Sequence, residues 1–562
     1  MGKVVAIIAP FIDSSQYNMD FTLRLRKNDR ELTLAAFYEW AGEGFRAENI
    51  SRGVDYGDDI PAAGFYLQGV LHQNGYETVL TNKYDIEALR SLAQKDLFAI
   101  CVSTTMIITT SSLMSLLDAV KKEIPGVPVI AGGMFIWKSY IQYQNHLADP
   151  VNYPLRPEML FHPGNLGINA DVMVVAQHGV SSLIMILSEM GKRRKGDLEK
   201  RNQGEVDIMG DLGNISNLCF KRKDEFVFTK RLEENVNYDE DFTRWDLISE
   251  MPDKVPVMTS IGCPYRCRFC DFCRLYPKVI YRSKESLSKE LNLIKKSLGS
   301  KLAVLHVTDD NVFATKKRLF DVCGAISESG LTHWVGFMRG GEYSEEEMKA
   351  IMQSGLMMGK IGVESGDQGQ LDRMNKKQKA EKVKRGIEQL DAHGISMLLT
   401  FVVGFPGETS ETLENTAMFL NSLSLENLSL GYQVYPLSVM PLSELAEPEA
   451  RRKWNIKGVM DHWSHFTMNS TEAVTACHEL FRKVTRVPYS YSEESYFFNR
   501  GMFDYDSRLK LFKFRQELTV KLTEGAPGEQ ITPILKEMTS IMELPLEGIH
   551  DHLKDEIIIP SK

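Results

Sequence analysis

The chain has 562 residues, with 66 lysines and arginines against 75 aspartates and glutamates, and its formal net charge is −9. This acidic balance argues against a nucleic-acid partner, which usually requires a basic surface. At this length one hydrophobic core rarely organises the whole chain, so we expect several domains. Eight cysteines are too few for a disulfide framework, and neither a membrane span nor a signal peptide is apparent, so we expect a cytoplasmic protein without a membrane partner.

Strand and helix patterns alternate over the first 180 residues. Apolar runs predict buried strands at 4–9, 76–80, 97–103, 127–131 and 171–176. An amphipathic helix is predicted from Pro61 to about Gly75, and another carries apolar residues at 113, 116, 117, 120 and 124. Such alternation predicts a doubly wound parallel sheet with ligands at the carboxyl ends of its strands.

Two of these strand ends carry groups suited to a ligand. Hydroxyl groups follow the third strand at Ser103, Thr104 and Thr105. The fourth strand ends in Gly132 and Gly133, where a missing side chain lets another group come close. Loops of this kind are commonly rich in serine, threonine and glycine, so an ordinary loop explains each signal as well as a binding site does.

The segment Cys263-Pro-Tyr-Arg-Cys267-Arg-Phe269-Cys270 carries three thiols at a C-x3-C-x2-C spacing. It follows the apolar run 255–261 and Gly262, so we expect it in the loop after a strand. A four-iron cluster normally takes four thiolates. Three thiols in one run therefore predict a [4Fe-4S] cluster with one iron open to another ligand.

A zinc knuckle is the alternative interpretation of these thiols. Cys273 would be its fourth ligand, because Cys270-Asp-Phe-Cys273 is a second C-x2-C pair. Structural zinc sites usually join two well-separated pairs, and a knuckle does not require the pattern that follows in this sequence. We therefore expect Cys273 to be a spare thiol.

After the cysteines, strands are predicted at 302–307, 334–338, 360–363, 397–403 and 431–435. Helices are predicted to begin near Ser283, Lys316, Ser344, Ala380 and Ser410. With the strand before Cys263 these make six β/α units. The pattern predicts a partial TIM barrel, whose active site lies at the carboxyl ends of its strands.

Several of these strand ends carry groups suited to a charged nucleoside ligand. Asp309 and Asp310 end the second strand, Arg339 ends the third, and the runs Gly362-Val-Glu364-Ser-Gly366 and Gly404-Phe-Pro-Gly-Glu-Thr409 end the next two. Paired aspartates serve equally well as helix N-caps, worth about 1 kcal/mol, and a single arginine is most often simply exposed. Both interpretations stay open for each residue.

From residue 441 on, the sequence becomes helical in pattern and rich in aromatic residues. Its densest polar and aromatic clusters are Arg451-Arg-Lys-Trp454 and Trp463-Ser-His465-Phe-Thr467-Met468. A helical domain over a barrel mouth would exclude water from a reactive site. A structural cap with core aromatics explains the individual residues equally well.

The cysteine spacing, with an aromatic residue at Phe269, resembles the motif of the radical S-adenosylmethionine (SAM) superfamily. The upstream α/β sheet and the runs 362–366 and 404–409 resemble the cobalamin-dependent radical SAM enzymes, over roughly residues 1–440. The resemblance implies an α/β fold in four parts. These are a Rossmann-like cobalamin-binding domain (1–200), a linker (201–250), a partial (β/α)6 TIM barrel (251–440) and a helical C-terminal domain (441–562).

The resemblance also implies roles for the site residues. The open iron would chelate the amino and carboxylate groups of SAM, and Phe269 would lie near the adenine. Asp309 and Asp310 would hold the SAM amino group, Arg339 the carboxylate, and Glu364 the ribose hydroxyls or the carboxylate region. Residues 103–105 and 132–133 would surround the nucleotide tail of cobalamin.

One departure from cobalamin-binding domains concerns the ligand of cobalt. Such domains often carry D-x-H-x-x-G after the first strand, with the histidine on cobalt, and this sequence has a charged, aromatic insertion at 11–60 instead. Radical SAM methyltransferases often lack that histidine too. We expect the lower face of cobalt to meet a residue of the segment 52–65.

The implied activity is a methyltransferase acting on an unactivated carbon, or a phosphinate phosphorus, of a natural-product intermediate or a peptide or protein side chain. The reduced cluster would cleave SAM to a deoxyadenosyl radical, which abstracts hydrogen, and methylcobalamin would deliver the methyl group. A second SAM would remethylate the cobalt. An electron donor such as flavodoxin or ferredoxin would reduce the cluster.

Other activities remain open at this stage. A radical SAM cyclase or rearrangement enzyme would use the same cofactors, and a non-catalytic iron-sulfur sensor or scaffold would bind them without turnover. A methylthiotransferase is disfavoured, because that class needs a further cysteine triad upstream and only Cys101 and Cys219 precede Cys263.

Overall fold

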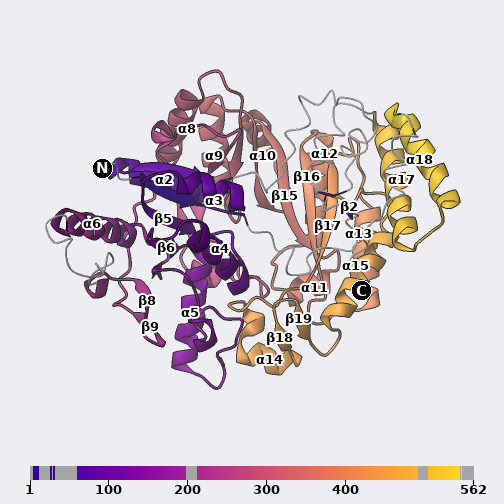
Figure 1. Ribbon diagram of the computed structural model, residues 1–562. Coiled ribbons are helices and arrows are strands. Elements are labelled where there is room, and N and C mark those ends of the chain that lie inside the picture. The colour runs from indigo at the N-terminus through magenta and orange to yellow at the C-terminus, as the bar shows by residue number, and fades with distance from the viewer. Residues whose placement is uncertain are drawn as a thin grey trace. The chain divides into compact units, whose positions relative to one another are not determined.

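The structure is a computed structural model that describes residues 4–11, 26–27, 30–31, 60–197, 212–490, 504–544 and 546. Most of the insertion at 11–60, and with it residues 52–59 of the segment predicted to meet cobalt, lies outside the described residues. The chain forms two compact units (Figure 1). Unit 1 comprises Met1–Ser14, Tyr56–Met258 and Arg282–Ala303, and unit 2 comprises Ser15–Asp55, Thr259–Tyr281 and Val304–Lys562.

Within the described residues, unit 1 holds a seven-stranded sheet in the order β4-β1-β5-β6-β7-β8-β9. The strands from β4 to β7 are parallel, and in chain order they run 2-1-3-4-5, as in flavodoxin-like doubly wound folds. Each lies within a few residues of its predicted position. Their bounds are Val4–Ile8 (β1), Glu77–Thr81 (β4), Leu97–Ser103 (β5), Val129–Gly132 (β6) and Val172–Val174 (β7).

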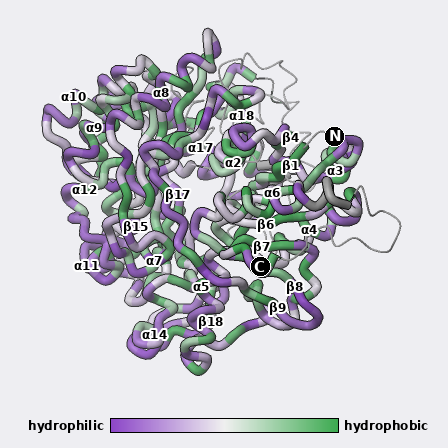
Figure 2. The backbone as a smooth tube through the Cα atoms, turned by 90° about the vertical axis from the view of Figure 1, so that its left-hand side faces the viewer, coloured by the Kyte–Doolittle hydropathy of each residue, from purple (hydrophilic) through white to green (hydrophobic). Residues whose placement is uncertain are grey.

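Helices connect these strands and bury their apolar sides against the sheet. Asp85 and Thr109 begin two of them by accepting hydrogen bonds from backbone N–H groups of the first turn. The strands β6 and β7 are among the hydrophobic segments in Figure 2, and they belong to a buried core with Val5, Leu71 and Ile186. The helices are Ala62–Gln73 (α2), Ile86–Ala93 (α3), Thr110–Glu123 (α4), Met134–Ala148 (α5) and Val180–Asp197 (α6).

The predicted linker at 201–250 contains regular structure, so the prediction is wrong for part of that segment. Strands β8 (Leu218–Arg222) and β9 (Glu225–Phe228) form a hairpin that pairs antiparallel with β7. Its turn contains Lys223 at φ 55, so no glycine or proline marked it in the sequence. Phe228 stacks on Tyr143 of α5 with ring centroids 5.0 Å apart, which holds the hairpin in place.

Unit 1 also contains β10 (Lys254–Val257) and α8 (Lys284–Leu298). Ser283 begins α8 by accepting from Ser286 N–H. Arg282 and Glu290 form a buried ion pair, and Trp245 Nε1 donates to Glu290 Oε1 at 2.8 Å. This fully paired charge cluster fastens α8 to the 3-10 turn Trp245–Leu247.

Unit 2 contains five consecutive parallel strands whose spatial order follows the chain. The crossover helices begin where the sequence predicts, because Thr315, Ser344 and Thr409 cap them. Closure of this β/α run into a partial barrel stays a prediction. The strands are Val304–Val307 (β13), Trp334–Arg339 (β14), Leu356–Glu364 (β15), Ser396–Val403 (β16) and Leu430–Pro436 (β17), and the helices are Lys316–Ser329 (α9), Glu345–Ser354 (α10), Gln368–Arg373 (α11), Ala380–Ala392 (α12) and Ser410–Asn421 (α13).

The two faces of this sheet differ in chemistry. Met338, Ile361 and Leu399 are register neighbours on one face, and all three are buried. Phe337 and Lys360 are neighbours on the other face, where Phe337 is 42% exposed. Because side chains alternate along a strand, Arg339 shares the face of Phe337. That face therefore combines open aromatic surface with positive charge.

The C-terminal residues belong to unit 2 and are not helical throughout. Residues 457–464 form a hairpin of Lys457–Val459 (β18) and His462–Ser464 (β19), a correction to the predicted helical domain. The helices Tyr505–Thr523 (α17) and Gly528–Met542 (α18) lie side by side, and Pro448–Trp454 (α14) and Ser470–Lys483 (α15) precede them. None of the helices in the described part of the chain is apolar and long enough to cross a bilayer.

Candidate active site around the cysteine loop

The three motif cysteines lie on a loop that is closed at its base. Strands Ser260–Ile261 (β11) and Ile280–Tyr281 (β12) pair antiparallel on either side of it, and the short helix Phe272–Leu275 (α7) lies within it. Gly262 has φ 82, and a Cβ atom there would lie 3.2 Å from Lys278 O. The loop therefore needs glycine at the point where its two ends meet.

The thiols of Cys263, Cys267 and Cys270 are free and near enough to affect one another. Burial is the main cause of the raised pKa values of Cys263 and Cys270, and the pKa of Cys270 reaches about 12. The charge of Cys267 raises both pKa values further. A thiol binds metal only as thiolate. Among the described residues, no three Cys, His, Asp or Glu side chains are arranged ready to hold a metal ion. Three soft thiols on one loop nevertheless match the donors of an iron-sulfur cluster.

Arg339 lies against the cysteine loop. Its guanidinium carbon is 3.7 Å from the ring centre of Tyr265, and its Nη1 is 3.7 Å from Cys267 Sγ. Its Nη2 donates to the carbonyl oxygen of Lys376. The charge of Arg339 also lowers the pKa of Cys263 against the effect of burial. The structure thus brings together a predicted ligand residue and the predicted metal ligands.

The two aspartates after β13 have different environments. Asp309 is buried and accepts hydrogen bonds from Thr259 N and Oγ1 at 2.6 Å each, and from Ser260 Oγ. Neither aspartate caps a helix, because Thr315 is the N-cap of α9. Asp309 instead joins the end of β13 to the start of the cysteine loop, a connection that no local pattern in the sequence indicates.

Asp310 is exposed, whereas Asp309 is buried. Partial desolvation, followed by the charge of Asp309, raises the pKa of Asp310 to about 6, and a hydrogen bond from Gly262 N–H opposes the shift. Since the side chain also reaches solvent, screening weakens this effect. Of the two aspartates, Asp310 is the one with a carboxylate open to a ligand.

Glu364 ends β15 in an unusual conformation. Its φ is 70, which is uncommon for a residue other than glycine, and the register with β16 shifts between Gly362 and Glu364. Its Oε1 lies 2.6 Å from Lys376 Nζ, and both side chains are buried. A Cβ atom on Gly362 would lie 2.6 Å from Glu364 Oε1, so this glycine makes room for the ion pair.

Lys376 is a site residue that the sequence analysis missed. It pairs with Glu364 through its side chain and with Arg339 through its carbonyl oxygen, so it connects two predicted ligand residues. Its signal was weak, because it stands in the charged run Asn375-Lys-Lys-Gln-Lys379, which is typical of an exposed loop. The observed burial comes from tertiary packing.

Phe269, the aromatic residue of the motif, packs against a buried core rather than standing alone. That core contains Met374, Phe405, Trp454 and Trp463, among others. Phe405 comes from the run Gly404-Phe-Pro-Gly-Glu-Thr409. The end of the cysteine loop and this turn therefore share one packed cluster.

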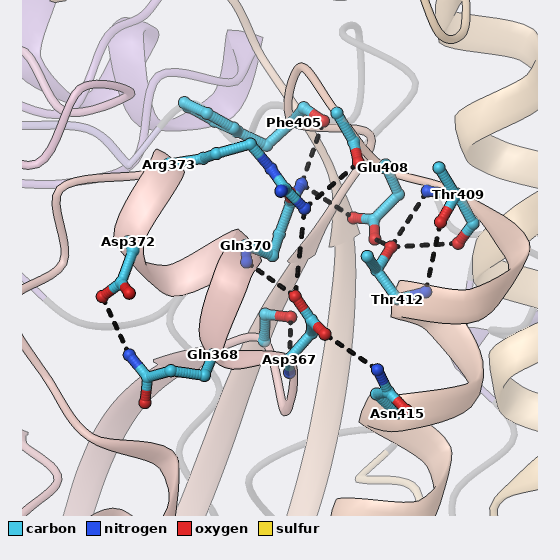
Figure 3. Close-up of polar contacts among 12 residues, drawn as sticks. Asp367, Gln368, Gln370, Asp372, Arg373, Phe405, Glu408, Thr409, Thr412 and Asn415 are labelled. Carbon is cyan, nitrogen blue, oxygen red and sulfur yellow. Dashed lines mark hydrogen bonds and ion pairs between the residues drawn. The ribbon is translucent and has the colours of Figure 1, made fainter.

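The turn at 404–409 is held by a network of polar contacts (Figure 3). Gln370 Nε2 of α11 donates to Phe405 O at 3.0 Å, and Arg373 Nη2 donates to Gly407 O at 3.2 Å. Glu408 is 3% exposed and accepts from Thr412 Oγ1, Gly404 N and Gln370 Nε2. Burial is the main cause that raises the pKa of Glu408 to about 7.

In unit 1, the two predicted ligand loops pack on each other. Thr104 is fully buried, and its Oγ1 donates to Gly132 O at 3.0 Å. Gly133 has φ 115, and a Cβ atom there would lie 3.1 Å from the backbone nitrogens of Thr104 and Thr105. Ser103 Oγ and Thr105 Oγ1 form a hydrogen bond of 3.2 Å. The chain's own loop after β5 therefore occupies part of the space that these two glycines leave free.

Comparison with known proteins places a family match on the cysteine loop. Residues 257–420 match the model of the Radical SAM superfamily, so this part of the chain is similar to a radical SAM domain. An uncharacterized methyltransferase of Pyrococcus horikoshii is 30% identical over 179 residues, which are 31% of this chain and 39% of that protein. The chain therefore matches about two fifths of the length of this relative.

Two solved structures resemble the chain over most of its length. The radical SAM methyltransferase TsrM from Kitasatospora setae, with cobalamin and a [4Fe-4S] cluster bound, aligns with a TM-score of 0.51 and 13% identity, over 79% of this chain and 77% of its own. The cobalamin-dependent radical SAM enzyme OxsB, with aqua-cobalamin and SAM bound, aligns with a TM-score of 0.53 and 13% identity, over 89% and 77%. At this identity the likeness is one of fold.

Proposed function

We propose that the chain is a cobalamin-dependent radical SAM methyltransferase. The observation that carries the proposal is the cysteine loop, with Arg339 and the Glu364–Lys376 pair gathered beside it at the carboxyl ends of parallel strands. Active sites of β/α barrels lie at this end of the strands. The match of residues 257–420 to the Radical SAM superfamily supports the same assignment.

In this proposal Cys263, Cys267 and Cys270 hold a [4Fe-4S] cluster, and Cys273 does not. The cluster, when bound, supplies the electron that cleaves SAM. The chain's own part is to supply three thiolates and to keep Arg339 beside them, where a positive charge favours their ionised form. Flavodoxin or ferredoxin is the proposed electron donor.

For SAM itself, the contacts that the candidate ligand residues already make within the chain support a preference among them. Asp310 is a better partner for the SAM amino group than Asp309, because the Asp309 carboxylate already accepts three hydrogen bonds from the chain. Arg339 is the proposed partner of the carboxylate. Glu364 would reach the ribose only through the part of its carboxylate that Lys376 leaves open.

Unit 1 is the proposed cobalamin-binding part. Its strand order 2-1-3-4-5 puts the topological switch point between β1 and β5, and the loop Ser103–Thr105 follows β5. Because the buried Thr104 hydroxyl donates to Gly132 O, Ser103 and Thr105 are the better candidates for contacts to a nucleotide tail. We propose no histidine on cobalt, since D-x-H-x-x-G is absent after β1.

The substrate is proposed only as a class: a natural-product intermediate, or a peptide or protein side chain, methylated at an unactivated carbon or a phosphinate phosphorus. Reconstitution with iron, sulfide and hydroxocobalamin should give about one corrinoid per chain. The paramagnetic resonance of the cob(II) form should lack the nitrogen splitting of an axial imidazole. Absence of corrinoid, or that splitting, would contradict the cobalamin proposal.

Product analysis separates methylation from the alternatives. The chain is incubated anaerobically with dithionite and with SAM that carries a trideuterated methyl group. An extract of the cells from which the chain comes supplies the substrate. Methylation predicts S-adenosylhomocysteine, deoxyadenosine and a product that gains a labelled methyl group. Loss of hydrogen from the product indicates a cyclase, and no turnover of SAM indicates a sensor or scaffold.

A further inference from the structure

We propose that Trp463, His465 and Thr467 are positioning residues, which hold the cysteine loop in place through the turn Gly404–Gly407. These three side chains form the "turn clamp". The proposal depends on the proposed function only in that the loop is taken to carry the cluster. This C-terminal run is one of the densest polar and aromatic clusters after residue 441, and it takes no part in the proposed SAM and cobalamin contacts.

His465 binds the first residue of the turn. Its Nε2 lies 2.8 Å from Gly404 O, and its Nδ1 lies 3.3 Å from the backbone nitrogens of both Thr467 and Met468. A carbonyl oxygen only accepts, so Nε2 carries the proton and Nδ1 accepts. The ring is therefore neutral, and burial lowers the pKa of His465 in agreement with this tautomer.

Trp463 and Thr467 also contact the turn. Trp463 stacks on His465 with ring centroids 4.8 Å apart, and its Nε1 donates to Leu437 O at 2.6 Å. A Cβ atom on Gly404, whose φ is 92, would lie 2.9 Å from the Trp463 ring. Thr467 Oγ1 accepts from Gly407 N at 3.1 Å. Both ends of the turn are thus bound to the same short segment.

The turn is in contact with the elements that carry the end of the cysteine loop. Phe405 is fully buried and shares its core with Phe269, which precedes the last motif cysteine. Arg373 Nη2 donates to Gly407 O, while Arg373 O accepts from Arg268 Nη1 at 2.6 Å. Arg268 N also donates to Met374 O at 3.0 Å. Residues 268–269 are therefore anchored to the turn and to α11.

The expected consequence is a loop that opens more often when the clamp is weakened. Cys267 is 9% exposed, so a reagent reaches its thiol mainly through local opening of the loop. Loss of the His465 contacts should increase that opening without touching any thiol. A loop that opens more readily should also lose iron more readily.

The test compares three full-length variants with the wild-type chain. His465→Leu removes the clamp contacts, and His465→Gln restores an amide donor toward Gly404 O. His462→Leu is the matched control, since His462 is an exposed histidine on strand β19, three residues before His465. The first readout is the alkylation rate of Cys267 and Cys270 in the iron-free, reduced protein, measured well below its unfolding temperature. The second is iron per chain after anaerobic reconstitution.

For His465→Leu we expect alkylation to speed up about tenfold, as the loss of one or two hydrogen bonds would produce in a local opening equilibrium. Iron content should fall at least about twofold for the same reason. His465→Gln should recover a large part of both, and His462→Leu should resemble the wild type. Wild-type rates in His465→Leu, or equal acceleration in the control, would overturn the proposal.

Two further outcomes keep the proposals separate. A wild-type chain that takes up no iron would count against the proposed function, while the alkylation rates would still decide on the clamp. If His465→Leu does not fold, Thr467→Val takes its place, because it deletes only the hydroxyl that binds Gly407 N. Unchanged alkylation in Thr467→Val would then refute the clamp.

Discussion

Glu408 is the group whose protonation should most clearly affect the stability of unit 2. It is 3% exposed, and its carboxyl group accepts hydrogen bonds from Thr412 Oγ1 and Gln370 Nε2, which Figure 3 shows, and from Gly404 N. Burial raises the pKa of Glu408 from 4.5 to about 7. The folded chain therefore holds this proton at pH values where the unfolded chain has lost it.

The sign of the effect follows from proton linkage. A raised pKa in the folded state contributes stability that is fully present below pH 4.5 and is lost as the pH rises through about 7. Between pH 5 and pH 8 these two pKa values give a loss of about 2.5 kcal/mol in the free energy of unfolding. Glu408→Gln cannot titrate, so the variant should lack this part of the pH dependence.

The assay is urea unfolding of the full-length chain at both pH values, with hydrogen exchange over residues 404–412 as the local measurement. The glutamine fits the site, because its oxygen can replace the acceptor of Gly404 N and its amide can donate to Thr412 Oγ1. Glu411→Gln is the control, since Glu411 is exposed in the first turn of α13, three residues after Glu408. Equal pH dependence in wild type and Glu408→Gln would refute the buried, raised-pKa carboxyl.

Three further predictions concern the remaining parts of the site. Cys270→Ala should abolish the visible absorption of the cluster and all SAM cleavage, whereas Cys273→Ala should keep both; retained cleavage in the former refutes the ligand assignment. Lys376→Met leaves the buried Glu364 carboxylate unpaired and should lower the free energy of unfolding by about 3 to 5 kcal/mol. Adding Glu364→Gln should recover most of this loss, and urea unfolding of the single and double variants is the measurement. Gly133→Ala places a Cβ atom 3.1 Å from two backbone nitrogens at φ 115 and should cost about 1 to 3 kcal/mol, visible as a lower melting temperature of unit 1.

Much of the secondary structure was predictable because local signals and burial agree along the chain. The strands of unit 2 are apolar runs bounded by polar residues, and Thr315, Ser344 and Thr409 stand where helices must begin. The hairpin β8–β9 was missed for the opposite reason. Its turn at 223–224 is charged, and its partner β7 lies some forty residues upstream, so only the folded chain brings the two together.

The site was predictable at the level of residue type but not of contact. The cysteine spacing identifies three thiols from one short segment, whereas the environment of Asp309 depends on Thr259, which lies fifty residues earlier in the chain. Lys376 gave no signal, because burial turns an ordinary loop lysine into half of an ion pair. Such pairings are set by tertiary packing, on which a single sequence gives no direct information.

The glycines of the runs 362–366 and 404–409 support this distinction, because a neighbouring part of the chain occupies the space where a side chain would lie. Gly362 leaves space for the Glu364–Lys376 pair, Gly366 for helix α13, and Gly404 for Trp463. A run that resembles a ligand-binding signature can therefore act mainly by letting structural elements approach closely. It follows that substitutions at these glycines would disturb the site without removing any ligand contact. More direct tests of SAM binding are variants of Asp310, whose charge raises the pKa of Cys263, and of Arg339, whose Nη1 lies 3.7 Å from Cys267 Sγ.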